Sequence, residues 1–105
     1  MLNPIKVIAV DDQPIVLQGI RRLIEQDREM QLIGVGSTGD QLLDLMAAHL
    51  PDIVLLDVNM PQHENETTST FRALPAIARL HNAYPEALVI VLSQYISITL
   101  IEGAF

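Results

Sequence analysis

The feature that most constrains the fold is a series of four short apolar runs separated by segments with helical spacing. The runs cover residues 5–10, 30–35, 53–56 and 87–92, and the first and third stop at aspartates. They are apolar rather than alternating, as expected for strands that helices cover on both faces. Strands that alternate with helices predict a parallel sheet with right-handed crossovers. At 105 residues, the chain is expected to form one α/β domain over residues 1–105.

The helices between these runs have recognisable ends. The first is expected over about 14–26, with a proline in its first turn, where proline is tolerated. Ser37, with an acid three residues later, predicts the start of the second helix by a pattern close to a capping box, and Pro51 ends that helix. A third helix is expected over 71–80, with Pro75 as an interruption or restart.

Composition narrows the possible functions. The net charge is −7, and the longest cluster of basic residues is Arg21-Arg22, which disfavours direct binding of nucleic acid or anionic membranes. The absence of cysteine excludes zinc-thiolate sites, disulfides and thiol catalysis. No apolar run approaches the roughly 20 residues of a membrane span, and no secretory signal is visible. We therefore expect a cytoplasmic domain.

Three carboxylates fall at the ends of predicted strands: Asp11 and Asp12 after the first, and Asp57 after the third. If those strands are neighbours, the carboxylates converge, and each raises the pKa of the others unless a cation is present. A hard divalent ion such as Mg²⁺ suits oxygen ligands, and a carboxylate beside it can attack phosphorus to give an aspartyl-phosphate. Ser93, after the fourth strand, could donate a hydrogen bond to that phosphoryl group. The alternative is that these are ordinary loop acids, with the first pair charging a helix N-terminus.

The same residues resemble a known family. Residues 7–17, 52–61 and 89–93, which contain Val10-Asp11-Asp12-Gln13-Pro14, Leu56-Asp57-Val58-Asn59-Met60-Pro61 and Val91-Leu92-Ser93, look like the matching strand ends of a response-regulator receiver domain. The match is collinear from residue 5 to the end of the chain. The start at 11–17, with Gly19-Ile20-Arg21, resembles the LuxR/NarL-type branch, whose full-length members carry a C-terminal helix-turn-helix.

The resemblance implies a flavodoxin-like, doubly wound parallel sheet with strand order 2-1-3-4-5. It implies that Asp57 is the phospho-acceptor for a sensor histidine kinase and that Ser93 is the switch hydroxyl. Asp11, Asp12 and Asp57, with the backbone carbonyl of Asn59, would hold Mg²⁺. In a longer protein the domain would then regulate an attached DNA-binding output domain, acting as a signalling module rather than as an enzyme.

The chain also departs from the family. The family's fifth strand begins with a lysine that pairs with the phosphoryl group, whereas the single lysine of this chain is Lys6, at the other end of the sheet. We therefore expect a chain that ends before the fifth strand and helix, leaves the fourth strand as an open edge and self-associates through that edge. A non-switching binding or dimerisation module is the alternative. A haloacid-dehalogenase-like phosphatase is disfavoured, because Asn59 stands where its second aspartate belongs.

Two segments allow more than one interpretation. The resemblance makes 96–101 a helix, but its β-branched alternation equally predicts a strand that could cover the open edge. The polar stretch 62–70 is expected to be a solvated loop. A metal site built from His63, Glu64 and Glu66 is the less favoured alternative there.

Overall fold

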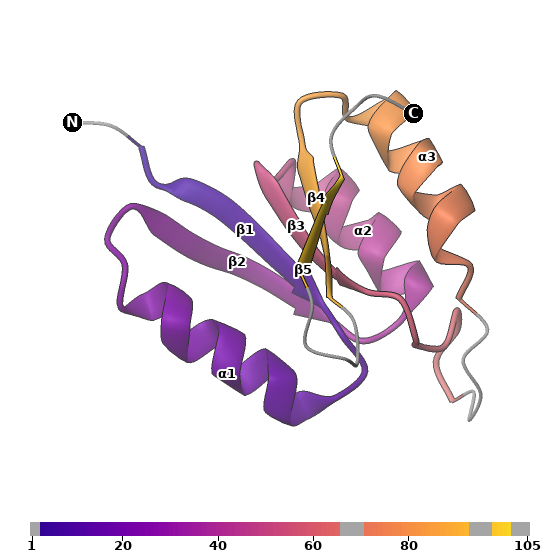
Figure 1. The fold of residues 1–105 in the computed structure, drawn as a ribbon, viewed down its shortest axis with the longest axis horizontal. Helices are drawn as coiled ribbons and strands as arrows, with labels where there is room; N and C mark the ends of the chain where they lie inside the picture. Colours follow the sequence, from indigo (N-terminus) through magenta and orange to yellow (C-terminus); the bar gives the residue numbers. More distant parts are fainter. Residues whose placement is uncertain (1–2, 66–70, 93–97, 102–105) are drawn as a thin grey trace.

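A computed structural model of the chain describes residues 3–65, 71–92 and 98–101. Its helices and strands alternate along the chain up to the last strand (Figure 1). They are β1 (Ile5–Val10), α1 (Pro14–Glu25), β2 (Met30–Gly36), α2 (Gly39–His49), β3 (Ile53–Asp57), α3 (Ala73–Ala83), β4 (Leu88–Leu92) and β5 (Ile98–Ile101). The predicted α/β class is confirmed, and each predicted strand and helix up to β4 is present within a few residues of its expected bounds.

The strands form one sheet in the order β2-β1-β3-β4-β5. The first four pair in parallel, with β1 between β2 and β3, as the prediction required. Helix α1 lies on one face of the sheet, and α2 and α3 lie on the other (Figure 1). This doubly wound arrangement brings the carboxyl ends of β1, β3 and β4 to the same end of the sheet.

The end of the chain corrects two predictions. The helix expected over 96–101 is wrong for Ile98–Ile101, which form strand β5, and the alternative of a covering strand is confirmed there. β5 runs antiparallel to β4, with Leu92 opposite Ile98. The β4 edge that was expected to be open is therefore paired, so the basis for self-association through it does not hold. The reason is physical: β-branched residues favour strands, and the edge of β4 offers backbone groups that a strand can satisfy.

The start of α2 is one residue later than predicted. Thr38, not Ser37, is the N-cap, and its hydroxyl oxygen accepts a hydrogen bond from the Gln41 backbone N–H at 3.2 Å. The Gln41 side chain in turn accepts one from the Ser37 backbone N–H at 2.7 Å. Both residues thus help to fix the N-terminus of α2, which lies next to the functional site described below.

Helix α3 accommodates the proline that was expected to interrupt it. The helix begins at Ala73, so Pro75 lies in its first turn. Backbone N–H groups in a first turn have no partner within the helix, so a residue without one costs little there. None of the helices in the described ranges is long and apolar enough to cross a membrane.

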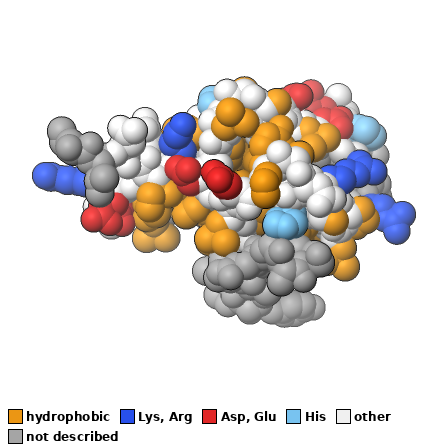
Figure 2. Space-filling model, turned by 90° about the horizontal axis from the view of Figure 1, so that it is seen from above, with side chains coloured by type: hydrophobic (Ala, Val, Ile, Leu, Met, Phe, Trp, Pro, Cys, Tyr) orange, Lys and Arg blue, Asp and Glu red, His pale blue; other side chains and the backbone are white. Residues whose placement is uncertain are grey.

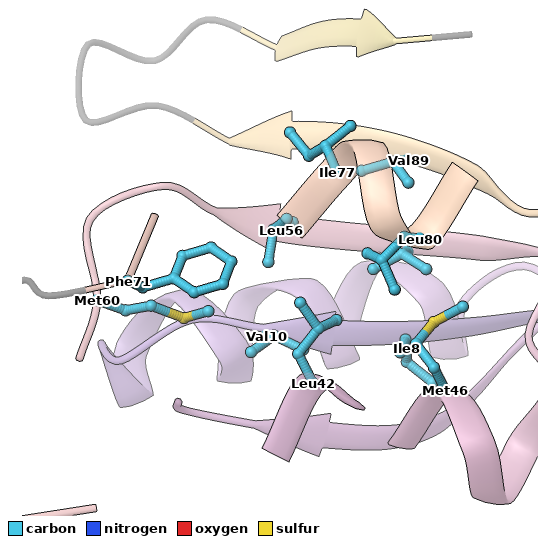
Figure 3. Close-up of a cluster of buried hydrophobic side chains, with 11 residues drawn as sticks. Ile8, Val10, Leu42, Met46, Leu56, Met60, Phe71, Ile77, Leu80 and Val89 are labelled. Carbon is cyan, nitrogen blue, oxygen red and sulfur yellow. The ribbon is translucent and has the colours of Figure 1, made fainter. Parts of the chain in front are cut away.

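The main core lies between the sheet and the α2–α3 layer (Figure 3). Its side chains come from alternate positions of the strands, from both helices and from the segment between β3 and α3. They are Ile8, Val10, Val54, Leu56, Val89, Leu42, Met46, Ile77, Leu80, Met60 and Phe71, each at most 7% exposed. Burial of one such side chain contributes about 1.5–3 kcal/mol. This packing fixes the ends of β1 and β3, from which the site is built.

Candidate functional site

The site forms where β1 and β3 end side by side. Val10 pairs with Leu56 in the parallel ladder, so the next residue of each strand, Asp11 and Asp57, lies at the same level. Their side chains are only 5% and 6% exposed, whereas Asp12 is exposed. One carboxylate oxygen from each of the three lies within 4.8 Å of the others. The predicted convergence of Asp11, Asp12 and Asp57 is therefore present.

Each buried carboxylate is oriented by a backbone donor two residues later. The Gln13 N–H donates to Asp11 Oδ1 at 2.8 Å, and the Asn59 N–H donates to Asp57 Oδ1 at 3.1 Å. Short local bonds of this kind are typical of aspartates that begin a turn after a strand. They hold both side chains toward the cluster.

The cluster perturbs the acidities of its members. Burial, the largest cause, raises the pKa of Asp57 to about 6, although the bond from Asn59 opposes that change. The charge of Asp11 also raises it, and Asp12 adds to the rise by accepting a hydrogen bond from the protonated form and by its own charge. Burial likewise raises the pKa of Asp11, with a contribution from the charge of Asp12. At neutral pH the ionised carboxylates of the site therefore lower the stability of the folded protein.

The donor set of the cluster fits a hard divalent cation. All three side chains offer carboxylate oxygens, which are the ligands that Mg²⁺ and Ca²⁺ prefer, and no nitrogen or sulfur ligand of the described residues joins them. The Asn59 peptide lies beside Asp57, as its hydrogen bond shows. A cation here would offset the repulsion that raises the two pKa values.

Ser93, the predicted switch hydroxyl, lies outside the described residues. Its neighbour Leu92 is the last residue of β4 and pairs with Asp57 across the β3–β4 ladder.

A set of contacts that the sequence did not reveal holds the segment after Asn59 against α2. The Gly39 N–H donates to the Pro61 carbonyl at 3.0 Å, and the Asp40 N–H donates to the Gln62 carbonyl at 2.9 Å. A Cβ on Gly39 would lie 2.6 Å from the amide end of the Gln62 side chain, which would have to move to make room for it. These partners are more than 20 residues apart, and no local pattern signals their pairing.

In the described part of the polar stretch, residues 63–65 are exposed and lie outside helices and strands, as the loop prediction requires, and two of their side chains also bond to α2. His63 Nδ1 lies 2.6 Å from Asp40 Oδ2, and the Glu64 carboxylate accepts a hydrogen bond from the Gln41 side chain at 3.2 Å. Both side chains thus bond to residues of α2. Glu66, the third residue of the less favoured metal site, lies outside the described residues.

Comparisons with known proteins agree with this geometry. Residues 7–105 match the family model described as the response regulator receiver domain. The transcriptional regulatory protein MctR of Rhizobium johnstonii is 30% identical over 105 residues, which cover 95% of this chain and 45% of that protein. The transcriptional regulatory protein DegU of Brevibacillus brevis is 27% identical over 107 residues, 97% of this chain and 42% of its own. The chain thus spans less than half the length of these relatives.

A solved structure supports the fold independently. The isolated receiver domain of RcsB from Salmonella enterica serovar Typhimurium, determined in the presence of phosphomimetic BeF₃⁻, superposes with a TM-score of 0.72 at 26% identity. The match covers 87% of this chain and 62% of that one.

Proposed function

The chain belongs to the response-regulator receiver family, and from that premise we propose that it is a phospho-acceptor whose Asp57 receives a phosphoryl group from a sensor histidine kinase. One observation carries the proposal above all others. Asp57 ends β3 with its side chain 6% exposed, grouped with Asp11 and Asp12. A buried carboxylate crowded by two others costs stability, and such a cost is typical of a functional site.

The chemistry follows from the state of Asp57. An oxygen of its carboxylate attacks the phosphorus of the donor phosphohistidine, the O–P bond forms and the P–N bond breaks, and the leaving imidazole takes up a proton. With a pKa of about 6, Asp57 is mostly ionised at neutral pH but more basic than an ordinary aspartate. The bond from the Asn59 N–H to Oδ1 fixes the plane of the carboxylate during the attack.

Asp11, Asp12 and Asp57, with the backbone carbonyl of Asn59, would hold Mg²⁺ in this proposal. The all-oxygen donor set supports that assignment. When bound, the ion supplies neutralisation of the charge on the phosphoryl oxygens. Ser93 would donate a hydrogen bond to the same oxygens, and the position of Leu92 beside Asp57 supports that role.

The names of the relatives suggest which process the receiver controls. MctR and DegU are transcriptional regulatory proteins more than twice the length that this chain matches. We propose that this receiver acts in the cytoplasm and controls an attached DNA-binding domain without touching DNA itself. The net charge of −7 supports the last point, as does Figure 2, where basic side chains lie in separate small groups.

A specific observation favours a second candidate, a receiver-like module that binds partners without switching. The single lysine, Lys6, lies near the start of β1, at the end of the sheet away from Asp57. Its backbone N–H is bonded to the Asp52 carboxylate at 2.8 Å. Among the described residues, therefore, no lysine lies where it could pair with a phosphoryl group on Asp57. The two candidates are distinguished by whether Asp57 is modified at all.

Intact mass spectrometry after incubation with acetyl phosphate and Mg²⁺ tests the proposal. We expect a gain of one phosphoryl group that EDTA abolishes. Asp57→Asn should prevent the gain, whereas Asp52→Asn, at the opposite end of the same strand, should leave it intact. No gain in wild-type protein that circular dichroism shows to be folded would contradict phosphorylation and favour the non-switching module.

A further inference from the structure

The side chains of Asp40, Gln62 and His63 form a latch between α2 and the segment that follows Asn59. The Asp40 carboxylate accepts a hydrogen bond from Gln62 Nε2 at 3.0 Å through Oδ1 and contacts His63 Nδ1 at 2.6 Å through Oδ2. Both oxygens of one carboxylate are thus used by neighbouring residues of the same segment. These bonds lower the pKa of Asp40, the bond from His63 being the largest cause. Asp40 therefore stays ionised and anchors the latch over a wide pH range.

The latch lies close along the chain to the acceptor. Asp57 is fixed by β3, and Pro61 and Gln62 are fixed by the backbone bonds to Gly39 and Asp40. Between them, the Met60 side chain is fully buried, and its carbonyl accepts a hydrogen bond from the Phe71 N–H at 3.0 Å. The Asn59 peptide, which orients Asp57, is therefore held in a short segment tied at both ends. The latch reinforces the far anchor of this segment, which the backbone bonds of Gly39 and Asp40 also hold.

Resting on the proposed function, we infer that Asp40 and His63 are positioning residues of the phosphorylation site, and that the latch holds the Asn59 segment more firmly when His63 is protonated. Histidine is the side chain that ordinarily changes charge between pH 5 and 8. A protonated imidazole makes a charge-assisted bond to Asp40, whereas a neutral one makes an ordinary hydrogen bond. As the pH falls through this range, the cation affinity of the site should therefore rise relative to the affinity of a variant without the latch.

The surrounding charges bear on this pH dependence. Among the described residues, Glu64 lies next to His63 on the same segment, and Asp44 lies one helical turn from Asp40 on α2. Arg72 and Arg79 line a cavity of about 260 Å³ together with Gly39 and Gln62, so the α3 side contributes positive charge. Glu64 is bonded to Gln41, which directs its carboxylate toward α2. The charges of the described residues near the latch are thus mixed, with two acidic and two basic side chains.

Mg²⁺ binding by isothermal titration calorimetry, measured from pH 6 to 8.5, tests the inference. Wild type should bind Mg²⁺ about two- to fivefold more tightly than His63→Gln at pH 6, the range expected for one exposed charged pair, and equally at pH 8.5. Titration of Asp57 affects both proteins alike and cancels in the ratio. Asp40→Asn should show the same loss of Mg²⁺ affinity relative to wild type as His63→Gln does. The variant with both substitutions should lose no more affinity than either single variant.

Hydrogen exchange of the Gly39 and Asp40 amides supplies a readout at the latch itself. Both amides donate to the segment, so they should exchange faster in His63→Gln than in wild type at pH 6. His49→Gln, at the far end of α2, is the matched control and should change neither measurement. An affinity ratio independent of pH, or additive losses in the double variant, would overturn the inference. Failure of Asp57 to gain a phosphoryl group would instead refute the proposed function, because Mg²⁺ affinity is measured without any donor.

Discussion

Strand β3 is flanked by two aspartates whose surroundings are opposite. Asp52, just before the strand, is exposed, and its carboxylate accepts the Lys6 N–H at 2.8 Å. Its backbone also bonds to both neighbours of β3, donating to the Lys6 carbonyl at 2.8 Å and accepting the Leu88 N–H at 2.9 Å. Asp57, at the other end of the strand, is buried and has two further carboxylates beside it.

The difference separates an acid whose surroundings stabilise its charge from one whose surroundings destabilise it. Asp52 joins β1, β3 and β4 at their amino ends by bonds that its carboxylate and backbone satisfy. Asp57 receives one backbone hydrogen bond, and its burial among negative charges raises its pKa to about 6. Removing the first carboxylate should therefore destabilise the protein, and neutralising the second should stabilise it.

The largest expected effect is stabilisation by Asp57→Asn. Ionising a group whose pKa rises from 3.8 to about 6 on folding costs the folded state up to about 3 kcal/mol. We expect the variant to be about 1–3 kcal/mol more stable than wild type in urea unfolding at pH 8. Because Asp57 keeps its proton to a higher pH in the folded state than in the unfolded state, wild type loses stability as the pH rises from about 4 to 6. The two proteins should therefore converge in stability near pH 4, and equal stabilities at pH 8 would show that the cluster carries no strain.

Mg²⁺ should narrow the stability difference between the two proteins. A cation held only by the folded state at ten times its dissociation constant stabilises it by about 1.4 kcal/mol. We expect wild type and Asp52→Asn to gain this stability when Mg²⁺ is added, and Asp57→Asn to gain much less. Thermal unfolding of each protein with and without the ion measures the gain. An equal gain for all three would place the cation elsewhere on this acidic chain.

The sequence was sufficient to predict the parallel strands and the acidic cluster, because both depend on short patterns that repeat at each strand end. Asp11 and Asp57 follow apolar runs directly, so the parallel order alone brings them together. The antiparallel course of Ile98–Ile101 and the bonding of His63 to Asp40 were not predictable in this way. Each depends on which distant backbone or side-chain groups remain without a partner after the sheet has formed, and no local pattern records that.

At the other end of β3, Asp52→Ala should destabilise the protein. Loss of the bond from the Lys6 N–H, at an exposed position, is worth about 0.5–1.5 kcal/mol. The effect should appear as a lower urea midpoint with an unchanged slope, with or without Mg²⁺. A variant as stable as wild type would mean that the backbone bonds of Asp52 alone hold the strand ends together.

The smallest expected effect concerns Asp40. Its pKa is lowered on folding, so it contributes stability that is present above the pKa of the unfolded chain and is lost as the pH falls through the lower folded value. As the pH rises from 3 to 5, the free energy of unfolding of wild type should therefore increase slightly relative to that of Asp40→Asn. This trend is the reverse of the one expected for Asp57. Chemical unfolding at these two pH values measures the difference, and a constant difference would argue against the bond to His63.

The pairing of β1 with β3 also has a kinetic consequence. Asp11 and Asp57 are 46 residues apart along the chain, and their meeting requires closure of a long loop. Contacts between residues so far apart in sequence form late in folding, because the entropy of loop closure is lost before the contacts stabilise the chain. The repulsion between these carboxylates therefore opposes the slow step in which the central strands join, and a bound cation would relieve it only afterwards. The acidic cluster is thus expected to slow the folding of the sheet that holds it.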